Sequence, residues 1–568
     1  MSEQEHFGTV IIGSGFGGSV MAHELAKDGK GSVCLLERGK AYPPGSFPRS
    51  PRAVGQNFWE PDRGFYGLFN AWTFRSLEAV VSSGLGGGSL IYANVLIRKE
   101  EKWFRPDEPG NNRRPWPIRR ADLEPHYDAA EAMLRPQRFP MDEPAYQVTL
   151  KTKAFRDAVS RVEGDLKVPL HWTLPNLAIT FANDGRPAAL GEPIAEDGPN
   201  LHGLPRYTCR LTGECDVGCN FGSKNSLDYN YLTHAKRHGA EIQTLAEVKT
   251  IRPRSSGRGF EIEYDDHSSG EPAAVRSQGP VKITADRLVL SAGTLNSTYL
   301  LLRNRQNFPA ISAQLGTRFC GNGDLLTFAL KCLDKEGKNP RARQIDPSRG
   351  PVITSTIRVD DESGTGGFYI QDAGYPEFVN WAVESMNAPG LIGRAFHFLV
   401  RRAMALLTGD PRSDLGGQLM VLMGKSEVSC CSMPLLGMGT DRPDGVMSLR
   451  GRRGQYLDIK WNKADSESYY RRVEDVSRRI AVAMGADFQE NPFTRYLNRL
   501  ITVHPLGGCP MGMTEAEGVV GTDGQVFGYP GLYVADGSVM PGPVGANPSL
   551  TIAAISHKFA RGIINGTP

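Results

Sequence analysis

Near the start of the chain, a short apolar run leads into a glycine-rich turn, Thr9-Val10-Ile11-Ile12-Gly13-Ser14-Gly15-Phe16-Gly17-Gly18. Residues 19–27 follow with apolar side chains at helical spacing, and a second apolar run at residues 32–36 ends at Glu37. The predicted order is therefore strand, glycine turn, helix, strand and acid, which is typical of a dinucleotide-binding unit. A glycine turn alone would be a weak signal, but here the strands, the helix and the acid stand in register with it.

Three glycines of this turn have separate expected tasks. Gly13 allows the tight turn, Gly15 lets a pyrophosphate approach the backbone, and Gly18 lets the helix pack on the strand. The N-terminus of the helix favours the negative charge of the pyrophosphate. Glu37 is placed to accept hydrogen bonds from an adenosine ribose. These four residues are the first predicted cofactor contacts.

A second glycine-rich loop spans residues 83–90, Ser-Gly-Leu-Gly-Gly-Gly-Ser-Leu. It has no lysine at the spacing of a nucleotide-triphosphate loop. The apolar segments on either side favour a backbone wall against a large flat cofactor over a flexible surface linker. A nicotinamide enzyme needs one such loop, whereas a tightly held flavin dinucleotide readily uses two, so the pair of loops favours FAD. The candidate contacts here are Gly84, Gly86, Gly88, Ser89 and Asn94.

More of the same sheet is predicted downstream. Residues 287–293 hold another strand and glycine turn, and residues 242–251 have the pattern of a strand pair. Val248 and Ala292 are the candidate cofactor contacts in these elements. Residues 253–281 are rich in serine, glycine and charge, which favours an exposed hairpin or loop.

Residues 340–500 differ from this pattern, because they contain alternating apolar runs and a helix-like stretch at 378–407. This block is predicted to be a substrate domain inserted into the cofactor domain. The expected fold class is α/β, a Rossmann-like FAD-binding domain with an inserted substrate domain of sheet and helices. The expected FAD-binding segments are residues 1–150, 201–325 and 501–568, and the expected substrate-domain segments are residues 151–200 and 326–500.

The C-terminal segment carries the residues that are expected to do chemistry. His504 precedes a Pro-Leu-Gly-Gly turn, and Asn547 stands just before Pro548 and a predicted helix. An alcohol hydroxyl is too weak an acid to ionise alone at neutral pH, but a positioned imidazole can take its proton. An asparagine amide can donate a hydrogen bond to the developing alkoxide. Asp536, Gly537 and Pro548 are predicted to contact the cofactor.

Taken alone, His504 would be interpreted as a capped structural histidine. Asn547 and the surrounding flavin motifs reverse that interpretation, so His504 and Asn547 are the predicted catalytic pair.

Together these motifs resemble those of the glucose–methanol–choline (GMC) oxidoreductases, and within that family the cholesterol-oxidase-like branch. The resemblance covers both glycine loops, the Ser291-Ala292-Gly293 turn, the Asn322-Gly323-Asp324 step and the whole C-terminus. It implies a GMC fold and oxidation of an alcohol by hydride transfer to the flavin. By position, His504 corresponds to the catalytic histidine of the family and Asn547 to its second polar partner. One departure is that Tyr92 and Ala93 stand where family members commonly carry Asn-Gly.

Three of the nine cysteines, Cys209, Cys215 and Cys219, fall within eleven residues. A structural disulfide is disfavoured in a reducing compartment. The remaining interpretations are buried structural thiols, a zinc site with His202 as fourth ligand, and a three-iron cluster, which needs only three thiolates. The spacing resembles the cluster-binding segment of bacterial FAD-dependent glucose dehydrogenases, which hold a 3Fe–4S cluster. That resemblance implies a dehydrogenase that passes electrons through the cluster to a redox partner protein or a quinone.

The bulk properties set further expectations. The chain has 568 residues and a formal net charge of +3, without the concentrated basic patch of a nucleic-acid binder. Because it shows no signal peptide and no long uncharged apolar run, we expect a cytoplasmic protein. Residues 391–407 are apolar with interspersed arginines, so the alternative to a substrate-domain helix is a lid or membrane-surface helix, which leaves membrane contact open.

The expected function is FAD-dependent oxidation of a bulky apolar alcohol, with a sterol favoured as the small-molecule substrate. One alternative is an oxidase that passes electrons to oxygen and produces hydrogen peroxide. An alternative of another class is a flavin-binding protein without alcohol turnover.

Overall fold

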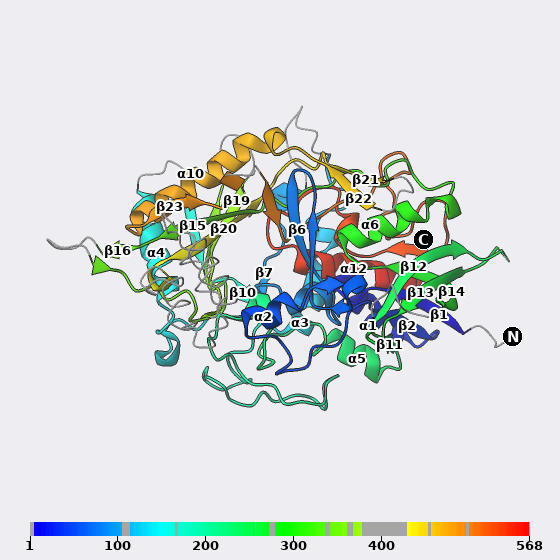
Figure 1. Cartoon of the computed structure of the whole chain (residues 1–568), viewed down its shortest axis with the longest axis horizontal. Helices are drawn as coiled ribbons and strands as arrows, with labels where there is room; N and C mark the ends of the chain where they lie inside the picture. Colours follow the sequence, from blue (N-terminus) through cyan, green and yellow to red (C-terminus); the bar gives the residue numbers. More distant parts are fainter. Residues whose placement is uncertain are drawn as a thin grey trace, which may run out of the picture.

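The computed structural model describes residues 5–104, 114–164, 169–255, 257–271, 279–334, 341–360, 367–377, 429–451, 456–491, 494–495 and 499–566. Two large sheets lie toward opposite ends of the long axis in Figure 1, and the C-terminal helix α12 (Ser549–Asn565) lies between them in that view.

The first sheet is built around the opening residues of the chain. β1 (His6–Ile12) pairs in parallel with β2 (Val33–Leu36) on one side and with β14 (Val281–Leu290) on the other. β11 (Glu241–Gln243) extends the sheet beyond β2, and β25 (Leu532–Val534) pairs in parallel with the end of β14. Strands buried on both faces are continuous apolar runs, which is why β2 is buried along its whole length.

The predictions for this sheet are largely confirmed. Residues 242–251 contain two strands of the sheet, β11 and the start of β12 (Ala246–Pro253). The hairpin predicted within residues 253–281 is present, because β13 (Phe260–Asp266) pairs antiparallel with both β12 and β14, but it belongs to the sheet and is not wholly exposed. The serine- and glycine-rich composition hid three inward-facing side chains, Phe260, Ile262 and Tyr264.

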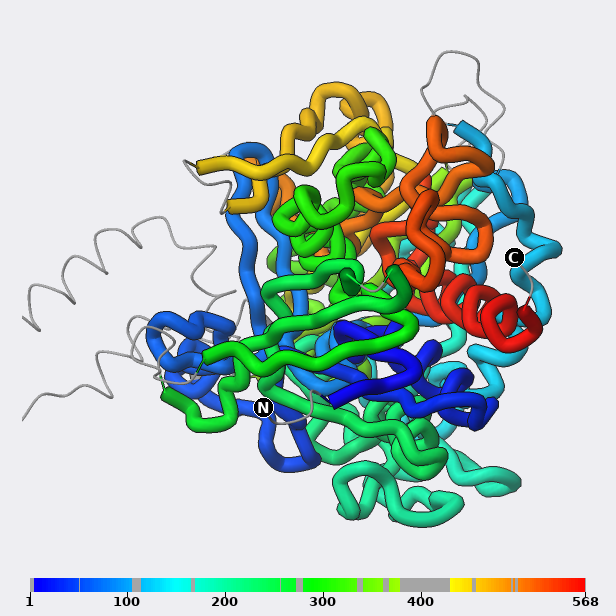
Figure 2. Tube along the Cα trace, turned by 90° about the vertical axis from the view of Figure 1, so that its right-hand side faces the viewer, coloured from blue at the N-terminus to red at the C-terminus, as the bar shows by residue number. Residues whose placement is uncertain are grey.

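Four helices pack together beside this sheet. α1 (Phe16–Asp28) lies against α12 and α5 (Tyr231–Arg237), and α12 also lies against α3 (Glu124–Leu134) (Figure 2). The approach of α1 to the end of β25 depends on Gly17, where an added Cβ would lie 1.5 Å from the carbonyl oxygen of Ala535.

The second sheet is antiparallel. Its strands, in spatial order, are β23 (Asp487–Glu490), β15 (Leu325–Leu330), β20 (Met433–Gly439), β19 (Phe368–Asp372), β18 (Thr356–Val359) and β9 (Leu170–Thr173). α10 (Glu467–Ala483) and α4 (Leu150–Glu163) pack against each other and against strands of this sheet. The chain therefore has the predicted α/β architecture, in which a mixed sheet with helices is joined to a separate antiparallel sheet with helices.

A smaller ribbon lies between the two sheets. β5 (Phe69–Thr73) and β6 (Leu77–Ser82) form a hairpin, and β24 (Leu500–Thr502) pairs in parallel with β6. β24 ends two residues before His504, so this pairing holds the backbone that carries the predicted catalytic histidine.

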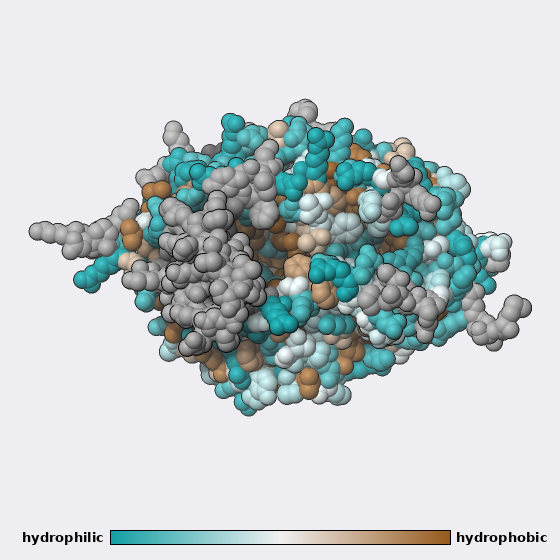
Figure 3. Space-filling model, in the orientation of Figure 1, coloured by the Kyte–Doolittle hydropathy of each residue, from teal (hydrophilic) through white to brown (hydrophobic). Residues whose placement is uncertain are grey.

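Within the described ranges, no helix is both long enough and apolar enough to cross a membrane. The face shown in Figure 3 is mainly hydrophilic, and apolar side chains are visible in a recess near its centre. The stretch 391–407, considered as a lid or membrane-surface helix, lies outside the described residues.

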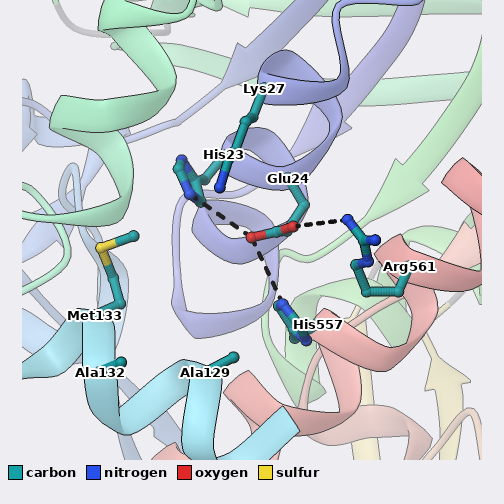
Figure 4. A pocket seen from close by; sticks show the side chains of 8 residues that line it. All are labelled: His23, Glu24, Lys27, Ala129, Ala132, Met133, His557 and Arg561. Atoms are coloured by element: carbon teal, nitrogen blue, oxygen red, sulfur yellow. Dashed lines mark ion pairs between the residues drawn. The ribbon is translucent and has the colours of Figure 1, made fainter. Parts of the chain in front are cut away.

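The outer side of α1 borders a cavity of about 400 Å³ that we call the histidine pocket (Figure 4). Its lining residues are His23, Glu24, Lys27, Ala129, Ala132, Met133, His557 and Arg561. Oε1 of Glu24 lies 3.6 Å from Nε2 of His23 and 3.7 Å from Nε2 of His557, and the Nδ1 atoms of His557 and His126 are 2.7 Å apart. Burial lowers the pKa of His23 to about 3 and the pKa values of His126 and His557 to about 4. These imidazoles are therefore neutral at pH 7.

Candidate active site

His504 is held by a carboxylate from a distant part of the sequence. Its Nδ1 lies 2.7 Å from Oδ1 of Asp324, and its side chain is 15% exposed against 3% for Asp324. The second oxygen, Oδ2, accepts hydrogen bonds from the backbone N–H of His504 (3.1 Å), the backbone N–H of Val503 (2.9 Å) and the Thr502 hydroxyl (3.0 Å). Asp324 thereby fixes both the backbone and the ring of His504.

This contact determines which nitrogen of His504 faces outward. A carboxylate accepts hydrogen bonds, so the Nδ1 beside it carries the proton in the neutral ring. The Nε2 lone pair is then left to accept a proton. The pair has the arrangement in which a carboxylate orients an imidazole for general base chemistry.

A single turn connects His504 to Asn547. Within residues 320–324, Cys320 pairs with Leu506, Asn322 binds the backbone of residues 545 and 546, and Asp324 binds His504. Asn322 and Gly323 both have a positive φ, 55° and 69°, a left-handed backbone conformation that makes the turn tight. The structure thus brings the two predicted catalytic residues to the same turn.

Asn547 stands at the beginning of α12 and is 6% exposed. Its Oδ1 accepts a hydrogen bond of 2.8 Å from Nε2 of Gln371 on β19. Its neighbour Ala546 belongs to a buried group with Trp103, Tyr369 and Met438. The surroundings of Asn547 are therefore dry, which strengthens any hydrogen bond that its amide makes.

The glycine turn has the shape expected of a pyrophosphate cradle. Gly13 has a φ of 98°, and a Cβ at Gly18 would lie 1.9 Å from the carbonyl oxygen of Gly13. A Cβ at Gly15 would meet nothing within 4 Å, and no side chain caps the N-terminus of α1 behind it. The uncapped N–H groups and the open space at Gly15 are what an incoming pyrophosphate requires.

Ser14 links three of the predicted cofactor elements. Its hydroxyl donates to Oε2 of Glu37 (2.6 Å) and accepts from the backbone N–H of Gly86 in the second glycine loop (3.0 Å). A Cβ at Gly87 would lie 2.5 Å from the Cα of Gly15, so the two glycine loops are in contact. The two loops and the acid form one continuous surface, as FAD would need.

Glu37 accepts three hydrogen bonds from the protein, from the Ser14 N–H, the Ser14 hydroxyl and the Gly39 N–H. A carboxylate offers about four acceptor sites. Glu37 therefore orders the turn and retains capacity for one ribose hydroxyl.

Among the predicted cofactor contacts, Asn94 shows most clearly that a hydrogen-bonding ligand could bind beside it. It is fully buried, and its Oδ1 and Nδ2 both have no hydrogen-bond partner among the described residues. Buried amides without partners are costly, so a ligand that pairs with Asn94 would offset that cost. Of the other contacts predicted in this loop, Gly88 borders open space, whereas the Ser89 hydroxyl bonds to the carbonyl of Gly86.

Asp536 joins the last strand to the turn after β14. Its carboxylate accepts from the Gly293 N–H (2.9 Å), the Ser297 hydroxyl (2.5 Å) and both the N–H and hydroxyl of Ser538. Burial raises the pKa of Asp536. Ala292, Gly537 and Pro548 lie at the ends of the elements that meet here, whereas Val248 lies on β12.

The cysteine segment shows no arrangement of metal ligands in the part of the chain that the structure describes. Cys209 and Cys215 pack in an apolar group with side chains such as Phe139, Leu177 and Ile353. Burial raises the pKa of Cys215 to about 11 and the pKa of Cys209 well above its usual range, so both are neutral thiols. Among the described residues, no group of three or more His, Cys, Asp or Glu side chains is arranged to hold a metal ion.

His202, the candidate fourth zinc ligand, has its Nε2 2.7 Å from Oδ2 of Asp228, and it belongs to no three-ligand group among the described residues. The segment instead supports the second glycine loop. The Lys224 ammonium donates to the backbone carbonyls of Leu90, Tyr92 and Cys215 at 2.8–3.0 Å. The segment with the three cysteines therefore packs beside the second glycine loop, and its structure does not support the predicted 3Fe–4S cluster.

The sequence is similar to known proteins over most of its length. Models of the GMC oxidoreductase family match residues 9–307 and 456–556. The chain belongs to the GMC oxidoreductase family. Its members bind FAD and act on CH–OH donors, so this GMC oxidoreductase is a flavoenzyme of that type.

Individual relatives agree with this assignment. A cholesterol oxidase of Mycobacterium tuberculosis is 28% identical over 98% of this chain and 90% of its own length. A long-chain-alcohol oxidase of Arabidopsis thaliana is 34% identical over 98% of this chain and 67% of its own length. The structure of a pyridoxine 4-oxidase from Mesorbium loti superposes with a TM-score of 0.54 at 18% identity, covering 97% and 98% of the two chains.

Proposed function

We propose that this GMC oxidoreductase oxidises a bulky, largely apolar alcohol, with sterols and long-chain alcohols as the leading candidates. The observation that carries the proposal is the contact of His504 with Asp324, which leaves Nε2 free as a proton acceptor beside the turn that also holds Asn547. The substrate class is supported by the similarity to a cholesterol oxidase and a long-chain-alcohol oxidase.

Each residue has a separate task in this proposal. His504 takes the hydroxyl proton at Nε2, and Asp324 stabilises the imidazolium that results. Asn547 donates a hydrogen bond to the alkoxide as charge develops on the oxygen. FAD supplies the hydride acceptor when bound, and the residues proposed to hold it are those of the two glycine loops with Glu37, Asn94 and Asp536.

The proposal is tested by anaerobic titration of the purified holoenzyme with sterols, long-chain alcohols, pyridoxine and sugars. We expect apolar alcohols to bleach the flavin and the polar ones to do so slowly or not at all. A flavin that no alcohol bleaches would leave the alternative of a flavin-binding protein without turnover. Faster bleaching by sugars than by apolar alcohols would reverse the proposed substrate class.

For the electron acceptor, we infer dioxygen, with hydrogen peroxide as product. The structural support for this choice is that Cys209 and Cys215 pack among apolar side chains and, within the described residues, form no three-ligand group with Cys219. The relatives named as oxidases point the same way. Peroxide formed in a one-to-one ratio with oxidised alcohol is the expected result. Stoichiometric iron and acid-labile sulfide in anaerobically purified protein, or reoxidation by a quinone far faster than by air, would contradict it.

A further inference from the structure

The role proposed for Asn547 requires its amide to face one way. A side-chain amide has a carbonyl at one end and an NH2 group of similar shape at the other. Only the NH2 end stabilises a developing alkoxide, whereas the carbonyl end would repel it. Rotation about the last torsion of an asparagine is broad and nearly two-fold. A partner that engages the carbonyl is therefore needed to keep the N–H turned toward the alcohol.

Gln371 is the residue that makes this contact. It lies on β19 and is fully buried. Its Nε2 donates to Oδ1 of Asn547 at 2.8 Å, while its Oε1 is 3.4 Å from Nδ2 of Asn547. The first distance is that of a good hydrogen bond and the second is near the limit. The carbonyl of Asn547 is thus firmly paired, whereas its NH2 group makes one long hydrogen bond to Gln371, which leaves its second N–H for the alcohol.

We propose that Gln371 is a positioning residue for alcohol oxidation, which acts by engaging the carbonyl of Asn547 so that the Asn547 N–H is presented to the alcohol oxygen. The inference rests on the proposed function, because it assigns Gln371 a task only through Asn547. Gln371 itself need not touch the substrate.

The backbone on the Gln371 side is held rigidly. β19 is an inner strand, paired with β18 through Thr356 and with β20 through Leu436. The next residue, Asp372, is fully buried in an ion pair of 3.2 Å with Lys151. Asp372 also accepts from the backbone N–H groups of residues 354 and 355. Successive residues of a strand point to opposite faces of the sheet. The Asp372 contacts therefore hold β19 on one face, while Gln371 contacts Asn547 on the other.

The backbone on the Asn547 side is held as well. Asn322 donates to the carbonyl of Ala546 (2.8 Å) and accepts from the Gly545 N–H (2.9 Å). With both backbones fixed, the remaining freedom is in the two side-chain amides. The Gln371 contact removes that freedom from Asn547.

A double-mutant cycle on the holoenzyme tests the proposal. Gln371→Met, Asn547→Ala and the double variant are compared with the unmodified protein by anaerobic rapid mixing with the best apolar alcohol. We expect Gln371→Met to slow the limiting rate of flavin reduction by ~10-fold, as loss of one hydrogen bond implies. In the Asn547→Ala background the same change should slow it by less than about 2-fold, because coupled residues are not additive. The alcohol concentration for half-maximal rate should change little.

Gln371→Glu provides a second, nearly isosteric variant in case Gln371→Met folds poorly. An ionised carboxylate would set an acceptor against the Asn547 carbonyl, so flavin reduction should be slow at neutral pH. It should recover as the pH falls and the introduced acid regains a proton to donate. Gln371→Met should show no such recovery. Gln314→Met is the matched control, because the Gln314 side chain bonds to the backbone carbonyl of Ala516 in an exposed loop and to the Thr317 hydroxyl.

The outcomes separate the inference from the proposed function. If Asn547→Ala is slow but both Gln371 variants react within about 2-fold of the unmodified protein, the role of Gln371 is wrong and that of Asn547 stands. The same holds if the effects in the cycle are additive. If Asn547→Ala itself reacts at the normal rate, the proposed function of Asn547 fails and the inference fails with it.

Discussion

Replacing Asp324 with asparagine should disable His504 by reversing the position of its proton. Oδ2 of Asp324 receives the backbone N–H groups of Val503 and His504, which cannot act as acceptors. An amide NH2 at that position would face two N–H donors and leave the Val503 N–H without its acceptor, at about 1–3 kcal/mol, while the His504 N–H would keep only the Thr502 hydroxyl. The asparagine carbonyl must therefore occupy the Oδ2 position, which places its NH2 against Nδ1 of His504.

An N–H donor facing Nδ1 requires that nitrogen to be the acceptor, so the proton of the ring moves to Nε2. His504 then has no lone pair to offer the alcohol. A wrong tautomer in an otherwise intact site lowers the rate by about 10³- to 10⁴-fold. The fold should survive, because the asparagine still accepts from the two backbone N–H groups.

The measurement is the anaerobic rate of flavin reduction by a saturating alcohol, with FAD content and thermal unfolding checked in parallel. Asp346→Asn is the matched control, since Asp346 pairs with Ser348 and Arg349 on the surface. A rate for Asp324→Asn within about 3-fold of the unmodified protein, with FAD bound, would refute the role given to this carboxylate.

Three further predictions follow from packing and charge. Gly15→Ala should fold but lose FAD affinity, because a Cβ there enters open space, whereas Gly17→Ala should fail to fold, because a Cβ there meets Ala535. Soluble expression and bound FAD are measured for both variants. Equal behaviour of the two would contradict the packing at these glycines. Lys151→Met should lower the free energy of unfolding by ~3 kcal/mol, because it leaves the buried Asp372 carboxylate without its cation. The double variant with Asp372→Asn should recover part of this loss. Additive losses in denaturant titrations would argue against the ion pair. The imidazoles of His23, His126 and His557 stay neutral in the fold, so the unfolded chain binds more protons as the pH falls from 6.5 toward 4, and the free energy of unfolding drops in that window. His126→Gln should make this decline shallower, by up to ~1.4 kcal/mol per pH unit. An unchanged slope in denaturant titrations would show that His126 is protonated in the fold.

Much of this architecture could be predicted because its signals are local. The strand, glycine turn, helix and acid over residues 6–37 lie close together in the sequence, and the geometry at Gly13, Gly15 and Gly18 follows from their spacing. His504 and Asn547 were also visible, because each sits beside a distinctive turn of glycine or proline.

The partners of the catalytic residues could not be predicted in the same way. Asp324 is 180 residues from His504, and Gln371 is 176 residues from Asn547. A lone Asp or Gln on a strand carries no pattern that points to such a contact, although Asp324 does stand in the Asn-Gly-Asp step that the family resemblance included. Ser14 lay within the quoted turn, yet only the structure shows its hydroxyl joining Glu37 to Gly86.

The cysteine segment is a prediction that the structure does not support. Close spacing in the sequence suggested that Cys209, Cys215 and Cys219 share a ligand. Spacing does not report burial, however, and Cys209 and Cys215 are packed among apolar side chains that favour the neutral thiol. The nearby lysine, Lys224, turned out to have the more direct link to the cofactor region through its contacts with the second glycine loop.

The central claim is that His504 accepts the proton of an alcohol as the bound flavin is reduced. The most direct measurement is anaerobic rapid mixing of FAD-loaded His504→Ala and unmodified protein with a sterol or long-chain alcohol, following flavin bleaching in a single turnover. The account predicts that the unmodified flavin is bleached and that the variant, with FAD still bound, is slower by about 10²- to 10⁴-fold. Bleaching of the variant at close to the unmodified rate would contradict it.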